Sequence, residues 1–217
     1  MGNKRFTITG LLVVTAFISA GLWVNSFFQA ARFRVPGLGV VTEEVPYDWY
    51  RSRALSISVF GGQERSVMVC GNYEFDSNRQ EYHTAIKNFL ALDPPALKDA
   101  EKYIFQYYQN CNSIFDPGEP GFVSIAKPED VWSHIQIGDP TVERRHYGTK
   151  GLYVSVECNC DWEPEHGLQI VFQDGARVCK VGAYDGHLTN SDAYGDENLE
   201  EVVYVSPHYQ PGLDQKP

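Results

Sequence analysis

The stretch "GLYVSVECNCDWEPEHGLQIVFQDGARVCKVGAY", residues 151–184, decides the fold, because its apolar residues alternate with polar ones in three successive runs. Alternation with a period of two is typical of β-strands that bury one face. The runs 151–160, 166–172 and 176–184 are therefore predicted to form three antiparallel strands. The Asp-Gly pair at 174–175 joins the last two runs and favours a tight hairpin turn, since both residues tolerate a positive φ.

The two faces of these strands are predicted to differ in polarity. We expect Val156 and Cys179 to flank Ile170 on the neighbouring strands, with Cys158 beside Leu168, so that one face is apolar. The other face collects the polar residues Ser155, Glu157, Gln169, Gln173 and Lys180. Because free cysteine behaves as a small buried hydrophobe, packing accounts for Cys158 and Cys179.

The rest of the domain is predicted to supply two helices and more strands. Apolar residues with helical spacing cover 77–92 and 93–115, and the second segment begins with a proline pair suited to a helix start. Further strands are expected at 54–60, 65–75 and 141–147. The predicted fold is α+β, with an antiparallel β-sheet of about five to six strands and two main helices on one face. An N-terminal transmembrane helix is predicted to precede it.

The N-terminal segment is the basis for this transmembrane prediction. Residues 6–31 carry no charge and follow Lys4-Arg5, and a helix of ~20 apolar residues spans a bilayer. We expect a single-pass membrane protein whose domain lies on the outer, periplasmic side. A cleaved signal, which leaves a periplasmic or secreted domain, is the alternative. The predicted organisation is 1–34 membrane anchor or signal segment, 35–52 linker, 53–195 α+β domain of unknown function, and 196–217 acidic C-terminal extension and tail.

The composition favours a globular domain with an acidic surface. The 217 residues are 43% hydrophobic and 21% charged, and the formal net charge is −10. Such a charge repels nucleic acid, whose binding depends on neutralising phosphates, and favours a basic protein partner or a cation. The sequence contains no Gly-rich phosphate loop, Gly-x-Ser-x-Gly elbow or His-Glu-x-x-His motif. We therefore expect no cofactor and no nucleic acid partner, and we assign no catalytic residue.

Acids, histidines and a tryptophan gather at one end of the predicted sheet. The candidate binding residues are Asp161, Trp162, Glu163, Glu165, His166, Asp185 and His187. Since 166–172 and 176–184 are antiparallel, the two loops that carry these residues should meet. As alternatives to partner binding, they suit acid/base chemistry or a divalent ion, or they are solvated turn residues. A zinc site of Cys158, Cys160 and His166, with His187 as a further candidate ligand, is a weaker match, because structural zinc usually has two ligand pairs.

Four motifs carry a family resemblance. They are "FLALDPPALKDAEKYIFQYYQNC", "PEDVWSHIQ", "LYVSVECNCDWEPEHGLQIVFQDG" and "VGAYDGHLTNSDAY". Together they resemble a bacterial domain family of unknown function, whose hallmarks are an acid-Glu-His-Gly-Leu strand and an Asp-Gly-His turn, over roughly residues 53–195. The resemblance implies no established activity and no catalytic residue. Acidic domains of this kind resemble immunity and interaction proteins of interbacterial toxin systems.

The expected function is therefore binding. We predict a membrane-tethered acidic protein-binding module of the toxin-immunity type, whose affinity weakens when the acids of residues 161–166 are neutralised. The alternative is a metal-dependent or acid/base enzyme that uses the His/carboxylate cluster at the sheet end. It requires the side chains of Glu165, His166, Asp185 and His187 to converge on one concave surface.

Overall fold

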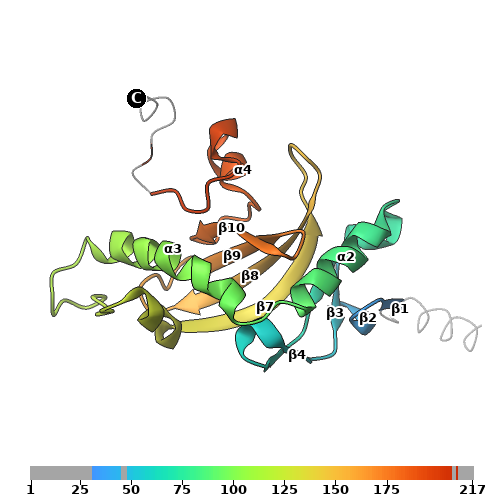
Figure 1. Cartoon of the computed structure of the whole chain (residues 1–217), viewed down its shortest axis with the longest axis horizontal. Helices are drawn as coiled ribbons and strands as arrows, with labels where there is room; N and C mark the ends of the chain where they lie inside the picture. Colours follow the sequence, from blue (N-terminus) through green and yellow to red (C-terminus); the bar gives the residue numbers. More distant parts are fainter. Residues whose placement is uncertain (1–30, 45–47, 207–208, 210–217) are drawn as a thin grey trace, which may run out of the picture.

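The computed structural model describes residues 31–44, 48–206 and 209 (Figure 1). The strands in this part of the chain are β1 (Arg32–Val35), β2 (Gly39–Glu44), β3 (Trp49–Ser52), β4 (Leu55–Ile57), β5 (Gln63–Arg65), β6 (Met68–Cys70), β7 (Ile135–Arg144), β8 (Leu152–Cys160), β9 (Leu168–Gln173) and β10 (Arg177–Gly182). The α-helices are α2 (Arg79–Leu90), α3 (Pro95–Asn112) and α4 (Asn190–Tyr194). The short 3₁₀ helices are η1 (Ser58–Phe60), η2 (Gly71–Phe75), η3 (Pro128–His134) and η4 (Glu197–Leu199).

Eight strands form one mixed sheet in the order β1-β2-β3-β6-β7-β8-β9-β10, and β4 pairs separately with β5. The prediction of an antiparallel sheet of five to six strands is therefore wrong, because the sheet is larger and β6 runs parallel to β7. Parallel neighbours require a crossover connection, and here α2 and α3 lie in that connection. The sheet also gains strands from residues 35–52, which we expected to be a linker but which pair through β2 and β3.

Helices α2 and α3, at the positions predicted from 77–92 and 93–115, cover one face of the sheet (Figure 1). Phe89 of α2 packs edge-to-face against Phe172 of β9, with ring centroids 5.3 Å apart. Ile104 of α3 and Cys158 of β8 are buried in the same core. Burial raises the pKa of Cys158 to about 12, so this cysteine acts as a hydrophobic side chain, as expected.

The pairing of β8 with β9 confirms the predicted register, since Val156 lies opposite Ile170. The predicted pairing of Cys179 with Ile170 is wrong, because Val181 takes that position and a bulge interrupts β10. The bulge adds one residue to the strand and places Cys179 on the face opposite the helices. On that face, Cys179 packs in a cluster with Tyr153, Val171 and Leu188.

The predicted Asp-Gly turn between β9 and β10 is confirmed, with φ of 51° at Asp174 and 66° at Gly175. A Cβ at Gly175 would lie 2.0 Å from the backbone oxygen of Ala85 in α2, so this close approach requires glycine. Asn88 of α2 donates a hydrogen bond from Nδ2 to the Asp174 oxygen at 3.0 Å. The turn therefore holds the hairpin against α2.

The chain after β10 folds back over part of the face opposite the helices, which we call the outer face. The segment pairs along the edge of β10, where Val181 donates its backbone N–H to the Val203 oxygen at 2.7 Å. It also holds the buried Arg145 through Asp192 and Glu200. The cluster around Cys179 includes Leu188 from this segment. The segment thus covers the outer face near β10 and leaves the area over β7 and β8 open.

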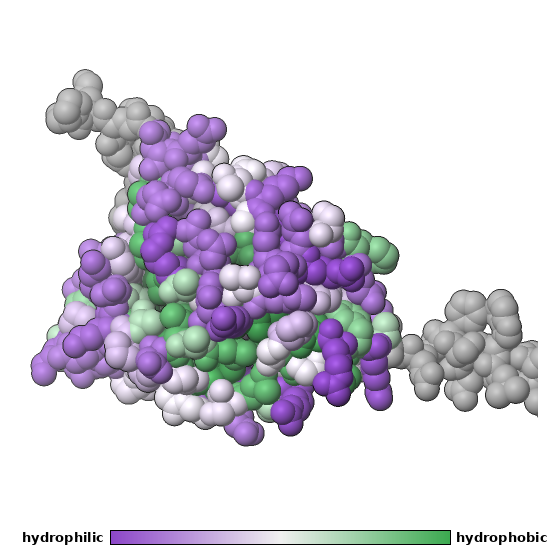
Figure 2. Space-filling model, turned by 45° about the vertical axis from the view of Figure 1, so that its right-hand side comes forward, coloured by the Kyte–Doolittle hydropathy of each residue, from purple (hydrophilic) through white to green (hydrophobic). Residues whose placement is uncertain are grey.

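The predicted transmembrane helix falls largely in residues 1–30, which lie outside the described residues, and residues 32–34 belong to β1. In the described part of the chain, no helix is long and apolar enough to cross a membrane. Hydrophilic residues cover most of the face seen in Figure 2, and hydrophobic residues are visible between them.

Candidate functional site

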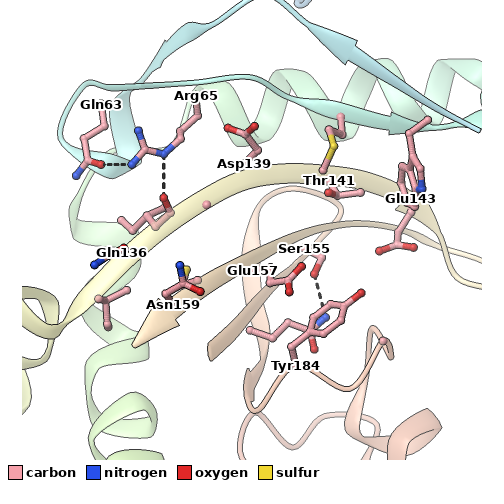
Figure 3. Close-up of a pocket in the computed structure, with 18 residues that line it drawn as sticks. Gln63, Arg65, Gln136, Asp139, Thr141, Glu143, Ser155, Glu157, Asn159 and Tyr184 are labelled. Carbon is pink, nitrogen blue, oxygen red and sulfur yellow. Dashed lines mark hydrogen bonds between the residues drawn. The ribbon is translucent and has the colours of Figure 1, made fainter. Parts of the chain in front are cut away.

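A groove of about 900 Å³ lies on the open part of the outer face (Figure 3). Strands β6 to β9 supply most of its lining, together with β5 and the segment after β10. Its polar lining residues include Gln63, Arg65, Gln136, Asp139, Thr141, Glu143, Ser155, Glu157, Asn159, Gln169 and Tyr184. A volume of this size is in the range of known ligand sites.

A bulge in β7 shapes the groove. The register of β7 against β8 shifts in the middle of the strand, and such bulges bend a strand, as β7 is bent in Figure 1. A Cβ at Gly138 would lie 2.1 Å from the Glu157 carbonyl oxygen, so the two strands can approach this closely only at a glycine. Asp139, the next residue, accepts a hydrogen bond from the Ser66 N–H at 3.1 Å and pairs with Arg51. These contacts fix the bulge from both sides.

Glu143 is a half-buried carboxylate in the lining of the groove. It lies on the same face of β7 as Thr141, because strand side chains alternate. Burial raises the pKa of Glu143 to about 7. Of the residues that the structure describes, none forms a hydrogen bond or an ion pair with this side chain. Glu143 therefore lacks the partner that buried carboxylates normally have.

Tyr184 and Glu157 also line the groove. Burial raises the pKa of Tyr184, and the carboxylates of Glu157 and Glu143 raise it further. Glu157 is exposed and lines the groove from β8 (Figure 3). Since nearby negative charges act together on the phenol, the part of the groove around Tyr184 is acidic.

A chain of hydrogen bonds supports the floor of the groove. Gln169 donates from Nε2 to Ser155 Oγ at 2.9 Å, and its Oε1 accepts from Lys180 Nζ at 3.0 Å. The Lys180 side chain is 2% exposed and also donates to Asp185 and to the His187 backbone oxygen. Burial lowers the pKa of Lys180, and Asp185 opposes this effect. The amide of Gln169 is thereby held in one orientation.

The residues predicted to bind a partner lie in several different environments. Trp162 is 3% exposed and packs in the core against Tyr107 and Tyr108, so it does not face a ligand. Asp161 lies at the surface, where its Oδ2 is 2.9 Å from His134 Nδ1.

Glu163, Glu165 and His166 form one cluster at the surface. One potential ligand atom of each lies within 4.8 Å of the others, and His166 Nδ1 is 3.5 Å from Glu163 Oε1. Glu163 Oε1 also accepts hydrogen bonds from the backbone N–H groups of Glu165 and His166, at 3.1 and 3.3 Å. These bonds close the loop between β8 and β9, so turn formation accounts for the cluster.

Asp185 and His187 belong to a second set of contacts. Tyr184 donates its backbone N–H to the His166 oxygen at 3.3 Å, which brings the two loops together, as expected from the antiparallel strands. Asp185, however, is held by Lys180 and by the His187 N–H at 2.9 Å. Within the described ranges, no ion pair joins Asp185 or His187 to Glu165 or His166. The side chains of the predicted enzyme site thus form two separate groups.

Sequence reasoning identified the polar face of β8 and β9, which is the groove floor, but missed Glu143. The signal was present, because the Thr-Val-Glu alternation at 141–143 places Glu143 on the same face as Thr141. Whether that face is open depends on the segment after β10, and no local pattern predicts where that segment folds.

These features define a domain with a mixed eight-stranded sheet, two helices on one face and an open polar groove on the other. Residues 37–188 match DUF6985, a domain of unknown function, so the chain belongs to this family. The expected membership of a family of unknown function is thereby confirmed. Comparisons with curated proteins and with solved structures gave no match.

Proposed function

We propose that the groove binds a basic segment of a protein partner, with Glu143 accepting hydrogen bonds from a lysine or arginine side chain. The observation that carries the proposal is the half-buried, unpaired carboxylate of Glu143, whose pKa burial raises to about 7. Ionising a carboxylate in such a place is unfavourable without a partner. A cation supplies that partner, and charge-assisted hydrogen bonds are among the strongest in proteins.

The surroundings of Glu143 suit a cation. Glu157 adds negative charge, and the aromatic residues Tyr184 and Trp49 line the same groove; aromatic rings attract cations. The register of β3, β6 and β7 sets Trp49 at the level of Glu143. The net charge of −10 also steers a basic partner toward the domain.

A toxin-immunity role is one setting for such a module. The likeness to immunity and interaction proteins supports it, and a basic toxin has the required charge. The partner would bind in the groove rather than at the loop of residues 161–166, because Trp162 is buried in the core and Glu163 closes the loop.

An acid/base or metal-dependent enzyme at the sheet end has less support. That alternative needs Asp185 and His187 to act together with Glu165 and His166, whereas Asp185 is engaged by the buried Lys180. The remaining acids and His166 lie on an exposed loop, where such groups commonly serve as turn residues.

Panning a random peptide library on the full-length chain tests the proposal. We expect the enriched peptides to carry lysine or arginine, and a labelled peptide from this set to bind roughly tenfold more weakly to the Glu143→Gln variant. Binding should also weaken as salt concentration rises, since ions screen charge attraction. Fluorescence anisotropy measures both effects.

Glu165→Gln is the matched control, because Glu165 is an exposed acid outside the groove. This variant should bind the labelled peptide as the wild type does. Enriched peptides without basic residues, or equal affinities of Glu143→Gln and the wild type, would contradict the proposal. A loss of affinity confined to Glu165→Gln would return the site to the loop at 161–166.

A further inference from the structure

We propose further that the occupant of the groove is dipolar: an extended protein segment that places a carboxylate on Arg65 and a basic side chain on Glu143. The inference rests on the proposed function and adds the polarity and length of the bound segment. Figure 3 shows the two groups at opposite ends of the groove, with Arg65 beside Gln63 and Glu143 at the far end.

Arg65 is a cation that is fixed in place without an anionic partner. Its Nε donates to the Ile137 oxygen at 3.0 Å, its Nη1 to the Glu64 backbone oxygen at 2.7 Å and its Nη2 to Gln63 Oε1 at 2.7 Å. All three acceptors are uncharged, and no carboxylate in the described part of the chain forms an ion pair with this guanidinium. Since a guanidinium has five N–H donors, it retains donors for an incoming carboxylate.

The carboxylate at the bulge already has a cationic partner, whereas the exposed Glu157 forms no ion pair within the described residues. Asp139 pairs with Arg51, and Arg51 forms a second ion pair with Glu44. Of the groove residues that the structure describes, Arg65 is then the unpaired cation at one end, and Glu143 is the unpaired, half-buried anion at the other. Complementarity therefore favours a ligand with the opposite polarity, negative at Arg65 and positive at Glu143.

The distance between the two ends sets the length of the bound segment. Arg65 contacts the carbonyl of Ile137, and Glu143 lies further along the same strand, β7. At about 3.3 Å per residue, the stretch from 137 to 143 spans at most ~20 Å, and the bulge shortens it. An extended peptide covers this distance with about five residues between its acidic and basic groups.

The carboxylate has two sources with the same chemistry. It is either an aspartate or glutamate side chain within the segment or the C-terminal carboxylate of the partner. Both present two oxygens that match the fork of N–H groups on arginine. The peptides described next distinguish the two sources.

Four labelled peptides of equal length test the inference on the full-length chain. The first has about five residues between an arginine and a glutamate, and the second replaces that glutamate with glutamine. The third carries the arginine and a free C-terminal carboxylate at the same spacing, and the fourth places glutamate next to arginine. The first and the fourth peptides are each also made with the order of glutamate and arginine along the chain reversed. Fluorescence anisotropy gives the affinities for the wild type, Arg65→Gln, Arg65→Lys and Glu143→Gln.

We expect the first or the third peptide to bind about tenfold more tightly than the second and the fourth, because two linked charges bind together. The peptide that does so identifies the source of the carboxylate. Arg65→Gln should remove this advantage, and Arg65→Lys should retain part of it.

Equal affinities of the wild type for all four peptides, each still weakened by Glu143→Gln, would overturn the inference and leave the proposed function standing. Because that comparison needs only the wild type and Glu143→Gln, it holds even where Arg65→Gln fails to fold. Peptides that bind Glu143→Gln as tightly as the wild type would overturn the proposed function itself.

Discussion

Replacing Glu143 with glutamine is expected to stabilise the protein at pH 8, raising the free energy of unfolding by about 1–3 kcal/mol. At this pH the carboxylate is ionised in the folded and the unfolded chain, but the folded chain holds the charge half-buried without a partner. Glutamine removes that cost, and the range allows for solvent screening of a partly exposed group. A substitution that stabilises the fold and weakens binding is typical of a functional residue.

The same substitution should remove a pH dependence of stability. The folded-state pKa of Glu143 is raised from 4.5 to about 7, so the folded chain binds this proton more tightly than the unfolded chain does. Wild-type stability therefore falls as the pH rises through this interval, and it levels off above the folded-state pKa. Urea denaturation should show the difference between Glu143→Gln and the wild type close to zero near pH 4 and largest near pH 8.

Glu157→Gln is the control for this stability measurement, because Glu157 is exposed in the same groove. It should change the free energy of unfolding by less than about 0.5 kcal/mol at either pH. A Glu143→Gln variant that is less stable than the wild type at pH 8 would show that Glu143 has a partner within the fold, which contradicts our account.

Replacing Lys180 with methionine is expected to lower the free energy of unfolding by about 2–4 kcal/mol. The Lys180 ammonium donates to Gln169, Asp185 and the His187 oxygen in a site where its side chain is 2% exposed. Methionine fills a similar volume but leaves these acceptors without a donor. The range lies below that of a fully buried pair, because the Asp185 side chain is 37% exposed. Chemical denaturation measures the loss.

Asp185→Asn separates the charge from the hydrogen bonds around Lys180. Asparagine keeps an acceptor for Lys180 and for the His187 N–H, so this variant should lose less stability than Lys180→Met. A Lys180→Met variant as stable as the wild type would contradict the structural role of these hydrogen bonds.

Sequence patterns correctly predicted the elements whose conformation depends on residues close together in the chain. The alternation in 151–160 and 166–172 gave strands β8 and β9 with the correct pairing of Val156 and Ile170. The Asp-Gly pair gave the hairpin turn, because its positive φ values are a property of those two residues. Helical spacing at 77–92 and 93–115 likewise located α2 and α3.

Long-range pairing was not predictable from the same patterns. Nothing in the three residues of β6 indicates that they lie parallel to β7, which comes some sixty residues later in the chain. The bulge in β10 adds one residue, and a single residue is enough to reverse the face that Cys179 occupies. Residues 35–52 contain the prolines and glycines of a linker, yet β2 and β3 pair there.

The candidate site was missed for a related reason. Acids and histidines that lie close together in the sequence, such as those of residues 161–166, were interpreted as a binding site. Turns, however, are rich in polar residues without binding a ligand. The groove, by contrast, combines Arg65, Glu143 and Tyr184 from three distant segments. Only the folded chain shows that Glu143 is half-buried and unpaired, whereas the acids of the loop have partners or are solvated.

Direct titration of Glu143 by NMR, in the full-length chain with ¹³C-labelled glutamate carboxyl groups, tests the central claim most directly. The account predicts that Glu143 titrates with a pKa of about 7 in the free protein. It also predicts that a bound basic peptide lowers this pKa, because a nearby cation favours the ionised form. A pKa near the ordinary glutamate value in the free protein, or one that a bound basic peptide leaves unchanged, would contradict it.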